Sequence, residues 1–178
     1  SEQIISNVMD GKSDHIKFYR WENESEFEKL LFEVLEKELS IKDEHSFNKS
    51  LGSQDGNYFN FRTAVNNVED WQILSPVKSK IFGTVLLNRL IHKKFKAKAI
   101  DFAYRLYKTS KPMGSEEVVY GDKIINLKNE SRDKYTYPSD GLNYIANGEV
   151  GIIVGKFANN GDKPFYLEVE FSSQKGYK

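Results

Sequence analysis

The residues best suited to chemistry lie together in the segment 73–90, ILSPVKSKIFGTVLLNRL. An apolar run ends there in a Ser-Pro pair, a loop with two lysines follows, and a Gly-Thr pair precedes a helical pattern. Hydroxyls, ammonium groups and the N–H groups at a helix start are the groups that hold a phosphate or another anion. The same spacing also fits a loop whose hydroxyls only cap and whose lysines are solvated. The residues that we predict to face an anion are Ser75, Pro76, Lys78, Gly83, Thr84 and Asn88.

A basic stretch surrounds this segment. Between Lys78 and Lys111 there are ten basic residues and one acid, Asp101, which gives a local net charge of +9. The segment 22–44 has the opposite sign, with nine acids and three lysines for a net charge of −6. A basic run suits phosphate if it lies on one face, and otherwise only keeps a helix solvated. The residues that we expect to extend the anion-facing surface are Lys80, Arg89, Lys93 and Lys94.

Other chemistry is poorly supported. The tripeptide 11–13, Gly-Lys-Ser, lacks the earlier glycine, the preceding strand and the following helix of a phosphate-binding loop. The chain has no cysteine, and its three histidines are too scattered to predict a metal site. No nucleophile motif or assignable carboxylate pair occurs. We therefore predict no catalytic residue and no metal ligand within this sequence.

Length and composition set the class of protein. The 178 residues are 39% hydrophobic and 29% charged, with 26 basic and 26 acidic side chains, which is typical of one globular domain or two small ones. The zero net charge means that a nucleic-acid partner would need a local basic patch. No apolar run approaches the ~20 residues that cross a bilayer. We expect a cytoplasmic protein with no membrane partner.

Strands and helices alternate in the first part of the chain. Phe27, Leu30, Leu31 and Leu35 recur at helical spacing after a Ser25/Glu28 capping box. The expected elements are a strand at 15–21, a helix at 25–39, a loop at 40–67 with a short strand at 59–63, a strand at 71–74 and a helix at 82–94. Such alternation favours βαβ units with a parallel sheet. The prediction for residues 1–111 is an incomplete α/β domain with a parallel sheet.

The pattern changes in the last part of the chain. Residues 100–107 fit a short helix, and β-branched or aromatic runs then occupy 118–127, 144–154 and 165–171. Gly-containing turns divide these runs, which indicates a small antiparallel barrel or sandwich over residues 112–178. The turn residues that we interpret as structural are Gly121, Asp122, Asn147, Gly148 and Gly151.

Two blocks of sequence resemble a known family. The segment 73–90 resembles the fourth helicase motif of RecD-type superfamily 1 DNA helicases. The blocks 120–129, YGDKIINLKN, and 146–155, ANGEVGIIVG, resemble the start of the small β-barrel that these helicases insert into their second motor domain. The resemblance covers most of residues 15–172. It implies that residues 1–111 are an incomplete second RecA-like domain and that residues 112–178 are its inserted SH3-like β-barrel.

The resemblance also implies a mechanism and partners. Such helicases bind ATP and Mg²⁺ between two motor domains and move along single-stranded DNA by closing and reopening that cleft. The missing first motor domain would carry the phosphate-binding loop, so we expect no bound cofactor and no activity in this chain alone. Lys78 would be the closest phosphate contact, and RNA is an alternative substrate. Tyr135, Tyr137 and Tyr144 could stack on bases. A different interpretation is a stand-alone module that binds nucleic acid or a peptide without ATP.

Overall fold

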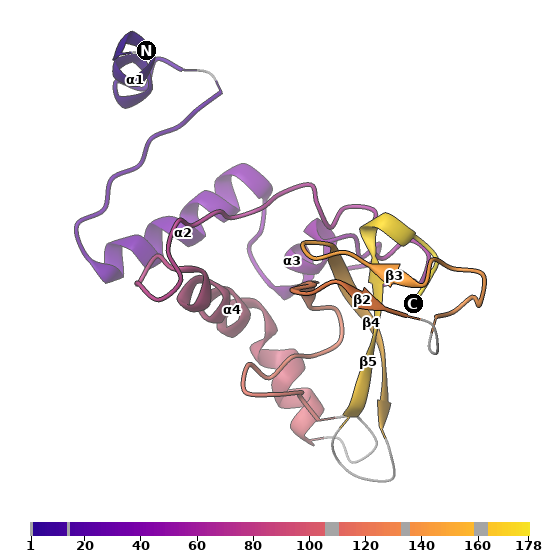
Figure 1. Cartoon of the computed structure of the whole chain (residues 1–178). Coiled ribbons are helices and arrows are strands. Elements are labelled where there is room, and N and C mark those ends of the chain that lie inside the picture. Colours follow the sequence, from indigo (N-terminus) through magenta and orange to yellow (C-terminus); the bar gives the residue numbers. More distant parts are fainter. Residues whose placement is uncertain (1, 14, 106–110, 133–135, 159–163) are drawn as a thin grey trace. The chain divides into compact units, whose positions relative to one another are not determined.

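The computed structural model describes residues 2–13, 15–105, 111–132, 136–158 and 164–178. Within this part the fold is mixed α/β, with four α-helices and small antiparallel sheets (Figure 1). The chain divides into two compact units, Ser1–Leu39 and Ser40–Lys178. The coarse α/β class predicted from the sequence is therefore confirmed, and the two units are described in turn.

The first unit contains α1 (Glu2–Met9) and α2 (Glu24–Leu39). The helix predicted at 25–39 is confirmed, but it begins one residue earlier than expected. The side-chain Oδ1 of Asn23 accepts a hydrogen bond from the Glu26 N–H at 3.0 Å, and the Asn23 carbonyl accepts the Phe27 N–H at 3.0 Å. Asn23 is thus the N-cap, in place of Ser25.

The strand predicted at 15–21 is wrong, because this segment forms no strand pairing. Its apolar side chains stay largely exposed, with Ile16 at 53% and Phe18 at 48%. The segment is held by local contacts instead. The Arg20 guanidinium lies 5.6 Å from the centre of the Phe18 ring, and the Lys17 ammonium pairs with Glu38 of α2 at 2.6 Å. Alternating sequence alone cannot make a strand without a neighbouring strand to supply its hydrogen bonds.

The helical part of the second unit contains α3 (Glu44–Ser50) and α4 (Thr84–Arg105). Helix α3 lies in the segment that we predicted to be a loop. A capping box explains it: Asp43 accepts the Ser46 N–H at 2.8 Å, and the Ser46 hydroxyl accepts the Asp43 N–H at 3.0 Å. Helix α4 joins the helix predicted at 82–94 to most of the one predicted at 100–107, whose last residues, 106 and 107, lie outside the described residues.

The described strands of the second unit form one three-stranded and one two-stranded sheet. The first has the order β1-β4-β5, from β1 (Lys123–Ile125), β4 (Val150–Ala158) and β5 (Pro164–Phe171). The second pairs β2 (Glu130–Ser131) with β3 (Tyr144–Ile145). All these pairs are antiparallel, with Ile124 opposite Gly151 and Ile152 opposite Glu170. The antiparallel strands predicted after residue 118 are therefore confirmed, and the 3-10 turn η1 (Ser172–Gln174) follows them.

The other predicted strands of this unit are wrong. Residues 59 and 60 have no regular structure, residues 61–63 form turns, and 71–74 form no strand. Trp71 is held by its side chain, because its indole N–H donates to the Ser50 hydroxyl at 3.2 Å and its ring meets Phe47 edge-on. Leu74 is 86% exposed. The described part of the chain has no parallel strand pair, so the parallel sheet expected for residues 1–111 is not formed there.

The core of the second unit spans both sides of the boundary predicted at 111/112. Phe59 packs edge-on against Tyr120 and donates its N–H to the Tyr120 hydroxyl at 2.9 Å. The Arg62 N–H donates to the buried carboxylate of Glu170 in β5 at 2.9 Å. Residues 40–105 thus share one core with the antiparallel sheet, and the division between compact units lies at residues 39 and 40.

Candidate nucleic-acid interface

The predicted anion-facing segment begins with a tight turn. The Ser75 hydroxyl accepts a hydrogen bond from the Val77 N–H at 3.3 Å and donates to the Val77 carbonyl at 3.1 Å. These bonds close the chain around Pro76. The Ser75 hydroxyl therefore forms its hydrogen bonds within its own turn. This agrees with the alternative in which the hydroxyls of this loop only cap the backbone.

The loop then folds back on the start of α4. The Thr84 N–H donates to the Val77 carbonyl at 3.1 Å, and the Val85 N–H donates to the Lys78 carbonyl at 3.3 Å. The Gly83 N–H donates to the Lys80 carbonyl at 2.7 Å. These three N–H groups are consumed by the loop, which corrects the expectation that they are free to hold an anion. The N-terminus of α4 is closed by its own chain.

Gly83 is required for this closure. A Cβ atom built at Gly83 would lie 2.6 Å from the Lys78 carbonyl oxygen and 2.8 Å from the Lys80 nitrogen. Both neighbours are backbone atoms, so a side chain could be accommodated only by opening the loop. The Gly83 position is thus explained by close packing of the backbone and not by ligand contact.

Four of the predicted side chains face solvent. Lys78, Lys80, Thr84 and Asn88 are all exposed. They come from the loop and the first turns of α4, and they supply two cations, a hydroxyl and an amide. Such groups can contact phosphate oxygens without distinguishing one base from another.

The basic charge of α4 is smaller than the sequence suggests. The Arg89 guanidinium forms two bonds with the Glu116 carboxylate, at 2.9 and 2.6 Å. Arg105 pairs with Asp101, four residues earlier, at 3.0 Å. Lys93 and Lys94 are exposed, as predicted for a basic surface. Two cations of this segment, Arg89 and Arg105, are therefore paired with carboxylates, so the net charge of the segment overstates the charge of this surface.

Lys96 is buried and joins three elements. Only 2% of it is exposed, and its ammonium donates to the Asn48 side-chain oxygen of α3 at 2.8 Å and to the Gly121 carbonyl at 3.2 Å. The ammonium also lies 3.8 Å from Asp122, and it sits above the rings of Phe47 and Phe59. Burial lowers the pKa of Lys96, while the carboxylates of Asp122 and Glu44 oppose that shift.

Asp122 completes this buried cluster. Its carboxylate accepts the Val119 N–H at 2.8 Å and lies 3.0 Å from Nε2 of His92 on α4. Gly121 has φ +78°, and a Cβ there would lie 2.6 Å from the Phe59 ring and 3.2 Å from the Lys96 ammonium. Gly121 and Asp122 thus attach the turn before β1 to α4, which places them in a structural role.

The hairpin before β4 contains the remaining turn residues. Gly148 has φ +92°, and its N–H donates to the Asn126 carbonyl at 2.8 Å. The Asn147 N–H donates to the Asn129 side chain at 2.8 Å. Gly151 is confined by β5, since a Cβ there would lie 2.7 Å from the Glu170 carbonyl oxygen. These three residues shape the hairpin and the sheet.

The predicted stacking tyrosines differ in their surroundings. Tyr144 of β3 is 50% exposed and Tyr137 is 57% exposed. The Tyr137 ring lies 6.0 Å from the Phe61 ring centre and 6.0 Å from the Lys178 ammonium. Tyr135 lies outside the described residues. Tyr137 and Tyr144 therefore have exposed aromatic surface on which a base could stack. Both lie in the β-rich part, about 50 residues or more after the segment 75–88 in the sequence.

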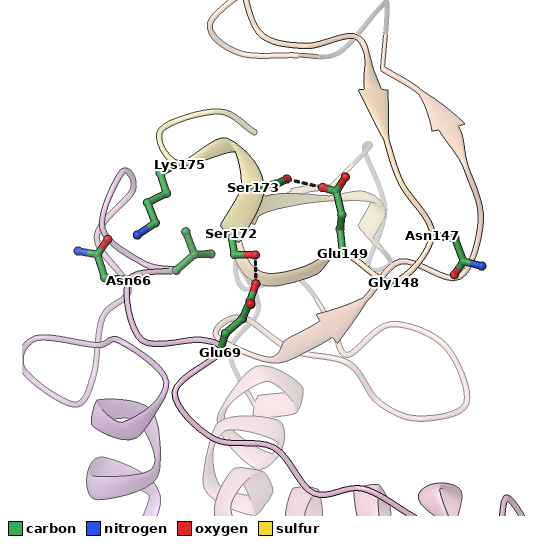
Figure 2. Close-up of a pocket in the computed structure, with 9 residues that line it drawn as sticks. Asn66, Glu69, Asn147, Gly148, Glu149, Ser172, Ser173 and Lys175 are labelled. Carbon is green, nitrogen blue, oxygen red and sulfur yellow. Dashed lines mark hydrogen bonds between the residues drawn. The ribbon is translucent and has the colours of Figure 1, made fainter. Parts of the chain in front are cut away.

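A polar pocket that the sequence analysis missed lies beside this hairpin (Figure 2). Its volume is about 560 Å³. Figure 2 shows Ser172 and Ser173 of η1 turned toward Glu69 and Glu149, and each hydroxyl donates to the nearer carboxylate. These acids come from distant parts of the chain, so no local motif could have revealed the pocket. Its carboxylates are already bonded to the serines, which makes it a poor site for phosphate.

The described residues contain no group of three histidine, cysteine or acidic side chains placed to hold a metal ion. None of the described helices combines the length and apolar character that a membrane span needs. Comparisons with protein-family models, curated proteins and solved structures found no match. The functional interpretation therefore depends on the residues and on their geometry.

Proposed function

We propose that this chain belongs to the second motor domain of a RecD-type superfamily 1 DNA helicase and contacts single-stranded DNA through the segment 75–88. The observation that carries the proposal is the compact loop at the start of α4. The loop closes on itself through backbone bonds and leaves Lys78 and Lys80 exposed. A rigid loop that presents two cations loses little conformational entropy when it meets a phosphate chain.

The β-rich part supports the same proposal. The two barrel-like blocks of the sequence pair as neighbouring antiparallel strands, β1 with β4. An SH3-like barrel would extend this sheet. ATP and Mg²⁺ would bind between this domain and a first motor domain, whose phosphate-binding loop has no counterpart in the sequence. The substrate of the motor would be single-stranded DNA, with RNA as an alternative.

The RecA-like part needs strands that pair with 71–74. The backbone groups of Gln72, Ile73 and Leu74 make no hydrogen bond with the described residues. The segment is held at Trp71 by its side-chain contacts and at Ser75 by the Ser-Pro turn. We therefore expect its backbone groups to be available for pairing, as those of a strand in a larger sheet would have to be.

The test is binding of labelled oligothymidylate, measured by fluorescence anisotropy at several salt concentrations. We expect the K78A/K80A double variant to bind more weakly and to reduce the salt slope by about 1.4, since each lost phosphate contact on a single strand lowers it by about 0.7. The matched control is K29A/K37A, which removes two exposed lysines of α2 and changes the net charge equally. An equal loss in both variants, or binding that does not depend on salt, would contradict the proposal.

A second readout concerns catalysis. The chain alone should not hydrolyse ATP, with or without oligothymidylate, because a phosphate-binding loop is needed to hold the triphosphate. ATP hydrolysis activity that copurifies with the wild-type chain would refute the assignment to a second motor domain.

The lack of parallel pairing among the described strands favours one competing function, a stand-alone nucleic-acid- or peptide-binding module. In that case the β-rich part would be the binding surface. The variant Y144A would then abolish oligothymidylate binding, while K78A/K80A would leave it unchanged. For the motor domain, K78A/K80A should weaken binding more than Y144A does.

A further inference from the structure

An acidic loop lies against the basic helix α4. Residues 113–118 form a tight hairpin-like loop, in which Met113 and Val118 exchange two backbone hydrogen bonds at 2.9 Å. Gly114 and Glu117 have positive φ angles of 70° and 53°. The loop tip therefore has a defined conformation, and it carries two consecutive acids, Glu116 and Glu117.

The two acids contact α4 in different ways. The Glu116 carboxylate forms a bidentate ion pair with the Arg89 guanidinium and accepts hydrogen bonds from it at 2.9 and 2.6 Å. Among the described residues, the Glu117 carboxylate accepts a hydrogen bond from a neutral donor, the Tyr104 hydroxyl, at 2.8 Å. The hydrogen bond from Arg89 lowers the pKa of Glu116, and the charges of Arg89 and His92 add to that effect. Glu116 is thus directed at a cation, whereas Glu117 is directed at a neutral hydroxyl.

We propose that Glu116 is an internal substitute for phosphate, which occupies Arg89 until nucleic acid displaces it. The proposal rests on the function proposed above and describes how its basic surface is regulated. A carboxylate and a phosphate both present paired oxygens to the planar guanidinium fork, so one can replace the other at the same nitrogens. The acidic loop then lowers the affinity of the surface until a phosphate chain competes.

The exposure of the pair makes such an exchange feasible. The side chains of Arg89 and Glu116 are 55% and 49% exposed. An ion pair in water contributes little stability, because both charges remain solvated. A phosphate chain held at neighbouring lysines would therefore need little free energy to displace Glu116 from Arg89. A buried pair, such as the one between Lys96 and Asp122, would not be released in this way.

The test compares E116Q with E117Q in the oligothymidylate assay. Both variants remove one negative charge from the same loop, but only E116Q frees a cation. We expect E116Q to tighten binding about two- to fivefold at low salt, the range that corresponds to one exposed ion pair. The salt slope should stay close to that of wild type, because phosphate displaces Glu116 in wild type and both complexes therefore contain the same phosphate contacts. E117Q should leave the affinity close to that of wild type.

Arg89 supplies the second half of the test. The variant R89Q should change wild-type binding less than K78A does, because Arg89 is already occupied, and it should remove the gain of E116Q in the double variant. Equal effects of E116Q and E117Q would overturn the proposed role of Glu116 and indicate a general charge effect. So would a gain from E116Q that persists without Arg89. Thermal unfolding of each variant checks that the loop change leaves the fold intact.

The two proposals fail in distinguishable ways. If wild type binds oligothymidylate through Lys78 and Lys80 but E116Q has no effect, the proposed role of Glu116 is wrong and the proposed function stands. If neither wild type nor E116Q binds at any salt concentration, both are wrong.

Discussion

Replacement of Lys96 by methionine should strongly destabilise the second unit. Methionine keeps the unbranched apolar stem of lysine and removes only the ammonium. The Asn48 side-chain oxygen and the Gly121 carbonyl then lose their donor, and Asp122 loses its buried cation. The side chains of Lys96 and Asp122 are only 2% and 9% exposed, so water cannot easily replace the lost contacts.

The size of the effect follows from this burial. Removal of one partner from a buried, hydrogen-bonded charge pair typically costs 3–5 kcal/mol. Relief of the desolvation of the ammonium, the same cause that lowers the pKa of Lys96, offsets part of that loss. We expect K96M to lower the free energy of unfolding by about 3 kcal/mol. The double variant K96M/D122N should cost less than the sum of the two single changes, because the groups interact directly.

Urea unfolding can be followed by the fluorescence of Trp71, which contacts Phe47 and Lys123 in the same unit. A W21F background removes the signal of the first unit. A loss below about 0.5 kcal/mol, typical of a surface substitution, would refute the idea that this cluster joins α3, α4 and the turn before β1.

The pH dependence offers an independent check. Because the folded-state pKa of Lys96 lies below its unfolded value of 10.5, the unfolded chain binds more protons between those two pKa values. The free energy of unfolding of wild type should therefore rise relative to K96M as the pH increases through that window toward 10.5. The comparison with K96M cancels the titration of other groups. A difference that falls with pH would contradict the burial of a charged ammonium.

Two further changes test the loop and the sheet. In G83A the new Cβ would collide with the Lys78 carbonyl. We therefore expect the free energy of unfolding in urea to fall by about 2 kcal/mol and oligothymidylate binding to weaken. Stability equal to wild type would refute the closed loop. The E170Q change puts an amide where a fully buried carboxylate accepts the N–H groups of Arg62 and Gly176, at 2.9 and 2.8 Å. One amide oxygen cannot replace both acceptors, so we expect a loss of about 2 kcal/mol in the same assay; a smaller effect than for the exposed control E130Q would contradict it.

The success of sequence prediction depended on where each element finds its hydrogen bonds. Helix α2 carries a long apolar stripe and makes its backbone bonds locally, so its pattern sufficed. The strands after residue 118 find partners close by in the chain, as β4 and β5 do. The strand predictions at 15–21 and 71–74 depended on distant neighbours that the described residues do not supply. Helix α3 could have been found from its Asp43/Ser46 capping box, had turn residues not been taken as evidence of a loop.

The candidate site shows a second limit, which concerns charge. Counting residues gives the segment 78–111 a net charge of +9, but the count cannot tell which cations face solvent. Lys96 lies in the core, and Arg89 meets an acid 27 positions later in the chain. Both partners, Asp122 and Glu116, lie outside the segment that was counted. Long-range pairing therefore changes a uniform basic run into a small exposed surface with an acidic loop beside it. The affinity for nucleic acid should then depend on individual cations and on their carboxylate partners, which is why E116Q and K78A/K80A should act in opposite directions.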